Sequence, residues 1–305
     1  MLLFMVGFGL APILIHYLDE PFYLDLLTRV VILSIAAVSL NLILGYGGMI
    51  SFGHAAYLGI GAYCIGIPAY YEEYGIATQL LTAIGVSALF ALVTGFVCLR
   101  TSGVYFIMIT LAFSQMVFFA MVSIEEYGGD DGLVIDVRSE IGRPIDLENN
   151  VQLYYLCLLF LAAFLYLVSR LMNSRFGMVV RGAAGNDSRM QSMGYATFQY
   201  RLLAYVIAGV ICGVAGWLLG NFTSFISPEM MDWTRSGELI FIVVLGGAGS
   251  LFGPVLGTVA FIAIEEWLSG ITVYWQLLFG IFLILVVLFG KGGLSGLIAK
   301  FDRKN

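Results

Sequence analysis

Apolar residues occur in long blocks along this chain, and this feature limits its fold more than any other. A helix that crosses a bilayer needs about 20 mostly apolar residues. Eight blocks approach that length, at residues 1–18, 22–44, 50–71, 78–99, 103–123, 151–172, 201–221 and 271–290. Only 11% of the 305 residues are charged, whereas a soluble domain has about 25%. The sequence therefore predicts an all-α polytopic membrane protein with about eight transmembrane helices.

The segments between these blocks are too short to form a second domain. The two longest are 124–150 and 173–200, and a domain usually has at least about 50 residues. The first block has neither a basic segment before it nor a small-residue cleavage site, so we interpret it as a retained helix and not as a signal peptide. Residues 1–305 are thus predicted to form a single transmembrane domain.

Basic residues are concentrated in a few segments, which predicts how the chain crosses the membrane. Ten of the 14 basic residues are Arg100, Arg170, Arg175, Arg181, Arg189, Arg201, Lys291, Lys300, Arg303 and Lys304. Short loops rich in lysine and arginine stay on the cytoplasmic side. We therefore expect both termini and the segment 173–201 in the cytoplasm, and the acidic loop 124–150 outside.

Residues 238–268 form a further apolar block that must differ from the others. Because the helix 271–290 is predicted to end at the cytoplasmic Lys291, this block has to begin and end on the outer side. Its centre holds five residues that break an ordinary helix, namely Gly246, Gly247, Gly249, Gly253 and Pro254. We interpret the block as a hairpin of two short helices, re-entrant or fully crossing, within a total of 8–10 spans. Interrupted helices in transporters lie at the substrate pathway, so these five residues are candidates for it.

The stretch GYGGMISFGHAAYLGIGAY, residues 45–63, combines glycines with polar residues inside an apolar region. Gly45, Gly47 and Gly48 loosen the chain, and Ser51, His54 and Tyr57 follow at helical spacing. One interpretation is close helix packing, because small residues let helices approach and Ser or His can bond across them. The other places these six residues on a wet pathway for the substrate. Packing is favoured for the glycines, while both interpretations stay open for His54, since an ionisable residue inside a membrane is costly.

A second set of glycines predicts where helices pack closely. Gly209, Gly213, Gly216 and Gly220 are separated by four, three and four residues, so they fall on one face of the helix 201–221. Such a face lets a neighbouring helix approach closely, and it indicates nothing specific about function.

The segment 173–201 is unusually long for a connection between two membrane helices. It fits a short amphipathic helix, with Met178 and Val179 among the basic residues Arg175, Arg181 and Arg189. Such a helix can lie on anionic lipid. It can equally dock in a groove on a soluble partner, and the pattern by itself leaves both possibilities open.

Five segments, in order along the chain, resemble the permeases of branched-chain amino-acid ABC importers, especially their M-type subunit. They are NLILGYGGMISFGHAAYLGIGAY, TSGVYFIMITLAF, YGGDDGL, RFGMVVRGAAGNDSRMQSMG and VVLGGAGSLFGPVLGT. Any one of them is a weak signal, whereas five in the family's order are a strong one. The resemblance covers nearly the whole chain and implies a transmembrane permease domain.

In that family the fourth segment resembles a coupling loop whose helix sits in a cleft of the ATP-binding subunit. The resemblance implies an ATPase-coupling role for Arg175, Phe176, Gly177, Arg181, Asn186, Asp187 and Gly194. The chain departs from the family where Glu-Asn-Glu and then Ala-Ala are usual, because it has Gly185, Asn186 and Asp187 and then Arg189 and Met190.

The chain has no nucleotide-binding motif and no cysteine spacing typical of a metal site. Residues 290–292 lack the upstream glycine and the hydroxyl residue of a P-loop, and the four cysteines lie far apart in apolar segments. We therefore expect no catalytic residue, no metal and no cofactor in this chain, with ATP and Mg on partner subunits. The resemblance implies two ATP-binding subunits, a second permease chain of the H type and an external substrate-binding protein. It also implies the inner membrane of a bacterium or archaeon, and no nucleic-acid partner.

The substrate implied by the resemblance is a branched-chain or related amino acid, carried by alternating access. Relatives of the family also move urea and short amides, so these are alternative substrates. A secondary transporter or channel for a small polar solute is a second alternative, although it would not need a basic docking segment. An intramembrane enzyme would need facing catalytic groups, and His54 has no evident acidic partner in the spans.

Overall fold

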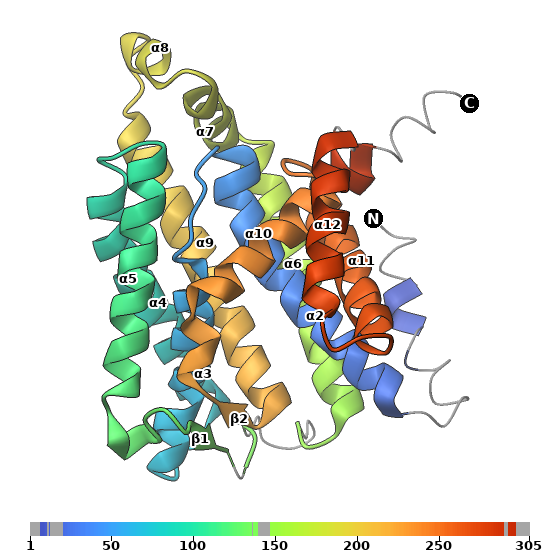
Figure 1. Ribbon diagram of the computed structural model, residues 1–305. Helices are drawn as coiled ribbons and strands as arrows, with labels where there is room; N and C mark the ends of the chain where they lie inside the picture. The colour runs from blue at the N-terminus through green and yellow to red at the C-terminus, as the bar shows by residue number, and fades with distance from the viewer. Residues whose placement is uncertain are drawn as a thin grey trace.

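The computed structural model describes residues 7–10, 12, 21–135, 137–139, 147–289 and 292–296. Within these ranges the chain is almost entirely helical, with one small sheet near one end (Figure 1). The predicted span 1–18 lies largely outside the described residues, as do Lys291, Lys300, Arg303 and Lys304.

Five helices in the described residues are long and apolar enough to cross a membrane. They are α2 (Pro21–Asn41) with its continuation η1 (Leu42–Tyr46), α4 (Ile76–Cys98), α5 (Val104–Val122), α6 (Asn150–Met172) and α9 (Thr197–Thr223). Four shorter helices complete the apolar bundle: α3 (His54–Tyr70), α10 (Trp233–Gly246), α11 (Gly253–Ser269) and α12 (Trp275–Phe289). The prediction of an all-α polytopic membrane protein is confirmed.

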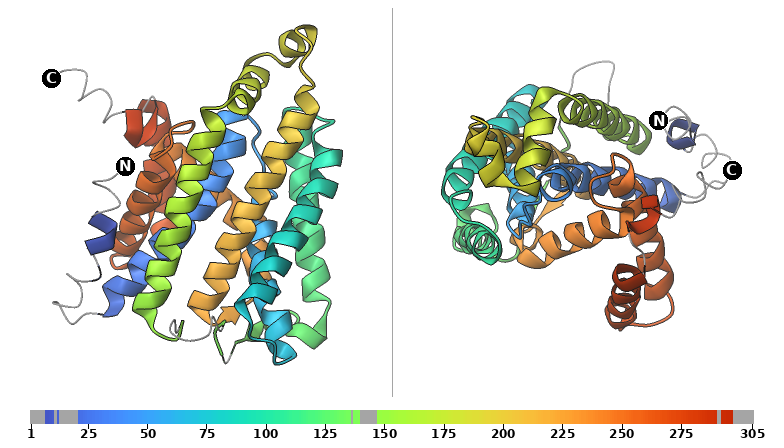
Figure 2. Two further views of the ribbon diagram at one scale, coloured as in Figure 1. Left: turned by 180° about the vertical axis from the view of Figure 1, so that it is seen from behind. Right: turned by 90° about the horizontal axis from the view of Figure 1, so that it is seen from above.

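Helix α9 lies at the centre of the bundle, between α3, α4 and α2 (Figure 2). Its glycine face allows this arrangement. A Cβ atom added to Gly216 would lie 1.8 Å from the carbonyl oxygen of Leu58, and one added to Gly61 would lie 1.8 Å from that of Gly213. The backbones of α3 and α9 therefore approach more closely than any side chain would permit, and the predicted close packing of this face is confirmed.

The segment 173–201 contains two helices, α7 (Arg175–Gly185) and α8 (Asp187–Ser192), which project together from one end of the bundle (Figure 1). At the opposite end, β1 (Leu133–Val134) pairs antiparallel with β2 (Phe225–Ile226), with Leu133 opposite Ile226. The short helices η2 (Glu125–Tyr127) and η3 (Pro228–Met231) flank these strands. The two segments predicted to face opposite sides of the membrane thus lie at opposite ends of the molecule.

The predicted hairpin near 238–268 is present as α10 and α11, joined by a turn at residues 247–252. Gly247 and Gly249 have φ angles of 105° and 81°, which residues other than glycine rarely adopt. A Cβ atom on Gly246 would lie 1.8 Å from the carbonyl oxygen of Gly253. The apolar block therefore breaks into two helices at these glycines, and α10 and α11 remain in close contact.

Helix α3 begins later than the predicted boundary at residue 50. Residues 47–53 are not helical, and α3 starts at His54. Gly48 has a φ angle of 64°, so the chain turns there before the helix can begin. Ser51 consequently precedes α3 and does not continue the helical face of His54 and Tyr57.

Candidate functional site

The two glycine-rich segments selected from the sequence, 45–48 and 246–253, meet in space through Asn41. The amide of Asn41 donates from Nδ2 to the carbonyl oxygen of Ser250 at 2.9 Å, and its Oδ1 accepts from the backbone N–H of Gly249 at 2.9 Å. A Cβ atom on Gly45 would lie 2.3 Å from the nitrogen of Gly249. The end of α2 is therefore fastened to the turn of the hairpin.

Asn41 was not among the residues selected from the sequence. It is buried, and it directly precedes the π-helix η1. Short π-helical segments are frequent at functional sites. The signal that could have identified Asn41 is an amide residue at the end of an apolar helix, immediately before a run of glycines.

The same segment also contacts the helix α7 at the projecting end of the molecule. A Cβ atom on Gly48 would lie 3.3 Å from that of Ala184, and the guanidinium of Arg181 lies 5.9 Å from the centre of the Tyr46 ring. Residues 41–48 therefore touch both α7 and the hairpin turn, which connects two sets of candidate residues that are distant in the sequence.

The coupling candidates are distributed over α7 and α8. Gly177 is buried against the end of α6, where a Cβ atom would lie 2.4 Å from the carbonyl oxygen of Met172, and Arg181 donates to that same oxygen. Phe176 lies 5.8 Å from the ring of Tyr200. These contacts attach α7 to the bundle.

The remaining coupling candidates lie toward the outer part of this segment. Asn186 caps α8 by accepting from the backbone N–H of Arg189 at 2.9 Å, and Asp187 lies 3.7 Å from Arg201. Arg175 is exposed. Gly194 has a φ angle of 87° with open space around it.

The polar candidates of the opening glycine-rich stretch are all buried. His54 Nε2 lies 2.7 Å from the hydroxyl of Ser39, and the hydroxyl of Tyr57 lies 3.1 Å from that of Thr94. Ser51 accepts from the backbone N–H of Gly53 at 3.3 Å. None of these three side chains lines the cavity described next.

A cavity of about 200 Å³ lies between α2, α3, α9, α10 and α11. Most of its wall is apolar and belongs to Leu33, Ala55, Leu58, Leu219, Phe222, Met230, Leu239, Ile242 and Phe261, with Thr223 beside them. Three charged side chains, Arg29, Arg235 and Glu238, complete the lining. Apolar residues such as Leu58 and Ile242 are buried, whereas the charged ones are partly exposed, so the cavity is apolar within and charged toward solvent.

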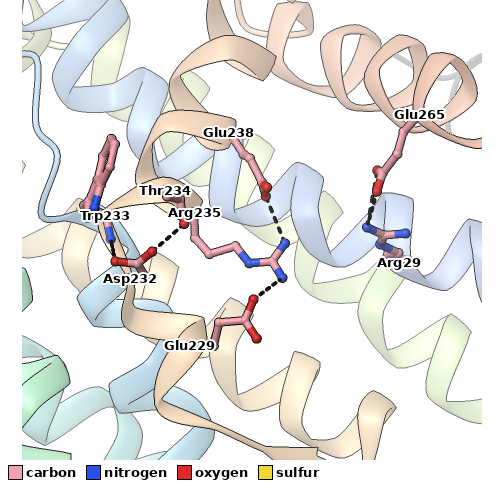
Figure 3. A network of polar contacts seen from close by, with 8 residues as sticks. All are labelled: Arg29, Glu229, Asp232, Trp233, Thr234, Arg235, Glu238 and Glu265. Atoms are coloured by element: carbon pink, nitrogen blue, oxygen red, sulfur yellow. Dashed lines mark hydrogen bonds and ion pairs between the residues drawn. The ribbon is translucent and has the colours of Figure 1, made fainter. Parts of the chain in front are cut away.

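Ion pairs connect the charged side chains around this cavity (Figure 3). Arg235 lies 3.1 Å from Glu238, one turn further along α10, and 3.5 Å from Glu229 of η3. Arg29 of α2 lies 3.0 Å from Glu265 of α11. None of these residues was selected from the sequence, because only the folded hairpin brings them together around the cavity.

Asp232 caps the start of α10 and thereby helps to position Arg235 and Glu238 on that helix. Its carboxylate accepts from the backbone N–H of Trp233 at 2.8 Å and from the hydroxyl of Thr234 at 2.7 Å (Figure 3). It also accepts from the amide of Gln115 at 3.0 Å. Burial by itself raises the pKa of Asp232, but the hydrogen bonds from Thr234, Gln115 and the backbone outweigh it and hold the pKa below its ordinary value. Asp232 is thus an ionised N-cap near neutral pH.

The described residues contain no cluster of three or more His, Cys, Asp or Glu that could hold a metal. The cavity has charged side chains of both signs beside an apolar wall. Such a lining can hold a small solute that has a charged part and an apolar part.

Comparison with known proteins gives a consistent result over most of the chain. The family described as branched-chain amino acid transport system permease component matches residues 22–288. The chain is 27% identical over 298 residues to the high-affinity branched-chain amino acid transport system permease protein LivM of Salmonella typhimurium, a match that covers 88% of this chain and 69% of that protein. It is 25% identical over 320 residues to the LivM protein of Escherichia coli, covering 96% of this chain and 74% of that protein.

A shorter match links the chain to a second type of permease. It is 30% identical over 147 residues to the probable branched-chain amino acid transport permease protein LivH of Methanocaldococcus jannaschii, covering 43% of this chain and 44% of that protein. No solved structure gives a significant match to this chain.

Proposed function

The chain belongs to the family of branched-chain amino acid transport system permease components, and we propose from this premise that it is the M-type permease subunit of an ATP-driven importer. Its substrate is a branched-chain or related amino acid. The importer moves this substrate across the inner membrane by alternating access, and partner subunits hydrolyse the ATP.

The proposed assembly contains two permease chains, two ATP-binding subunits and a substrate-binding protein on the outer face. The relatives named LivM support the substrate class, and the partial match to LivH supports a second, related permease chain as the partner. ATP and Mg are bound by the ATP-binding subunits.

The observation that carries the mechanism is the contact of residues 41–48 with both α7 and the hairpin turn. Helices α7 and α8 project from one end of the bundle, where they can reach a soluble subunit (Figure 1). Met178 on α7 and Met193 after α8 expose 61% and 59% of their surface, as expected for an apolar helix face that docks in a groove. Movement of α7 would reach the hairpin through the segment 41–48.

The first test is uptake by the assembled transporter in proteoliposomes. We expect leucine uptake that requires ATP and the binding protein. Uptake of leucine without ATP would indicate a secondary transporter or a channel instead. Uptake of urea or a short amide in place of leucine would keep the permease assignment and replace the substrate.

Met178→Glu tests the docking role of α7. A carboxylate at this exposed apolar position should be excluded from an apolar groove because its desolvation is costly. We therefore expect weaker copurification of the ATP-binding subunit, with a parallel loss of ATP hydrolysis and uptake. Ser123→Glu places the same charge on an exposed residue at the opposite end of the bundle and serves as the control. Normal copurification of the ATP-binding subunit and normal uptake with the Met178 variant would indicate that α7 and α8 lie on lipid and do not dock on that subunit.

A further inference from the structure

We propose that Arg235 and Glu238 bind the charged head group of an amino acid in the cavity between α2, α3, α9, α10 and α11. Arg235 takes the α-carboxylate and Glu238 takes the α-ammonium, while the apolar wall holds the aliphatic side chain. This inference rests on the proposed function and adds a substrate site within the permease itself.

The two charges match an amino acid in sign and spacing. Arg235 and Glu238 lie three residues apart on α10, so they project from neighbouring turns of one helix face, and their side chains come within 3.1 Å of each other. The α-carboxylate and α-ammonium of an amino acid are likewise adjacent and opposite in charge. A zwitterion can therefore pair with both residues at once, so that neither Arg235 nor Glu238 is left without a partner.

The apolar wall can contact the aliphatic side chain of such an amino acid. Leu58, Leu239 and Ile242 line the cavity and are almost completely buried, so they offer an apolar surface already shielded from water. The cavity of about 200 Å³ is smaller than the roughly 300–1,000 Å³ of sites for drug-sized ligands. Its size and lining favour a small solute with a compact apolar side chain.

Glu229 is a second acidic partner of Arg235, although it does not itself line the cavity. Its carboxylate lies 3.5 Å from Arg235, a longer separation than that of Glu238, and its side chain is 75% exposed. An exposed pair at this distance is weak, and a guanidinium can bind a carboxylate through two parallel hydrogen bonds. Glu229 is therefore a replaceable partner that competes with the substrate for Arg235.

The other ion pair at the cavity has a different role. Arg29 and Glu265 are 3.0 Å apart, and the side chain of Glu265 is only 18% exposed. They join α2 to α11 and neutralise each other. We assign the head group to Arg235 and Glu238, and not to Arg29 and Glu265, because the partner Glu229 of Arg235 is held only weakly.

The test is equilibrium binding of radiolabelled leucine to the detergent-solubilised complex of permeases and ATPases, without the binding protein. We expect Arg235→Gln and Glu238→Gln to raise the dissociation constant about tenfold or more, because each removes a charge-assisted hydrogen bond. Glu229→Gln should lower it by about threefold, since the competing carboxylate loses its charge. Glu125→Gln, which neutralises another exposed acid at the same end of the molecule, is the control and should leave binding unchanged.

The gain in affinity separates the proposal from simple misfolding, because a damaged protein does not bind more tightly. Weaker or unchanged binding by the Glu229 variant would overturn the proposal, as would unchanged binding by both the Arg235 and Glu238 variants. If the wild-type transporter takes up leucine but the solubilised complex does not bind it, the site is wrong and the proposed function stands. If the wild type takes up no leucine, the proposed substrate itself fails.

Discussion

At the scale of single residues, the surroundings of His54 bear on the two interpretations of a polar residue in a span. The His54 side chain is fully buried, and its Nε2 lies 2.7 Å from the hydroxyl oxygen of Ser39. That hydroxyl donates to the carbonyl oxygen of Ala36. The His54 ring meets that of Tyr57 edge to face at 5.7 Å. The imidazole therefore fills space between helices, and the contacts favour packing over a place on the substrate pathway.

His54→Leu should accordingly lower stability more than transport. We expect it to cost about 1–3 kcal/mol, from the lost hydrogen bond and altered packing, with a lower melting temperature and less folded complex. Uptake per folded complex should stay near the wild-type rate. Thermal unfolding in detergent and uptake normalised to protein amount measure the two effects. Normal stability with impaired uptake would instead place His54 on the pathway.

Single residues also show where prediction from the sequence stops. Gly247 and Gly249 were identifiable because glycines inside an apolar block indicate a break at that position. Arg235 and Glu238 carried no such signal, since charges beside an apolar block fit an ordinary loop equally well. The role proposed for them depends on a cavity whose wall comes from α2, α3, α9, α10, α11 and η3, and no local pattern encodes that arrangement.

At the scale of secondary-structure elements, one side chain links the end of α2 to the turn of the hairpin. The Asn41 amide makes both hydrogen bonds to the turn at Gly249 and Ser250. The glycines at this contact were predicted from the sequence as breaks or packing positions. Their partners could not be predicted, because Asn41 and Ser250 are 209 positions apart.

Asn41→Leu should loosen the hairpin turn without removing apolar bulk. Leucine has a similar size, but it leaves the N–H of Gly249 and the carbonyl of Ser250 without their partner, at a cost of about 1–3 kcal/mol for each group that stays buried. We expect a lower melting temperature and reduced uptake. Asn173→Leu, at an exposed asparagine that follows α6, provides the matched control and should change neither. An unaltered melting temperature for the Asn41 variant would show that the turn is held by other contacts.

At the scale of the whole molecule, five of the eight apolar blocks correspond to helices long enough to cross a membrane in the described residues, because the backbone of each membrane segment must form its hydrogen bonds within the segment. The boundaries were less accurate where glycines intervene, as at the start of α3. The basic residues predict the direction of crossing by a separate physical principle, the retention of lysine and arginine on the cytoplasmic side. Sidedness is therefore a prediction that the fold alone does not test.

Two single cysteines at opposite ends of the molecule test this sidedness. Ser188 lies in α8 and Ser123 follows α5, and both are exposed. Of the native cysteines, Cys98, Cys157 and Cys212 are buried, and the partly buried Cys64 can be replaced by serine. In intact cells, a membrane-impermeant thiol reagent should label Ser123→Cys and leave Ser188→Cys unmodified until the membrane is opened. Labelling of Ser188→Cys alone would show that the topology is opposite to the predicted one. It would place α7 and α8 outside, where no ATP-binding subunit could reach them, and the proposed coupling mechanism would then be untenable.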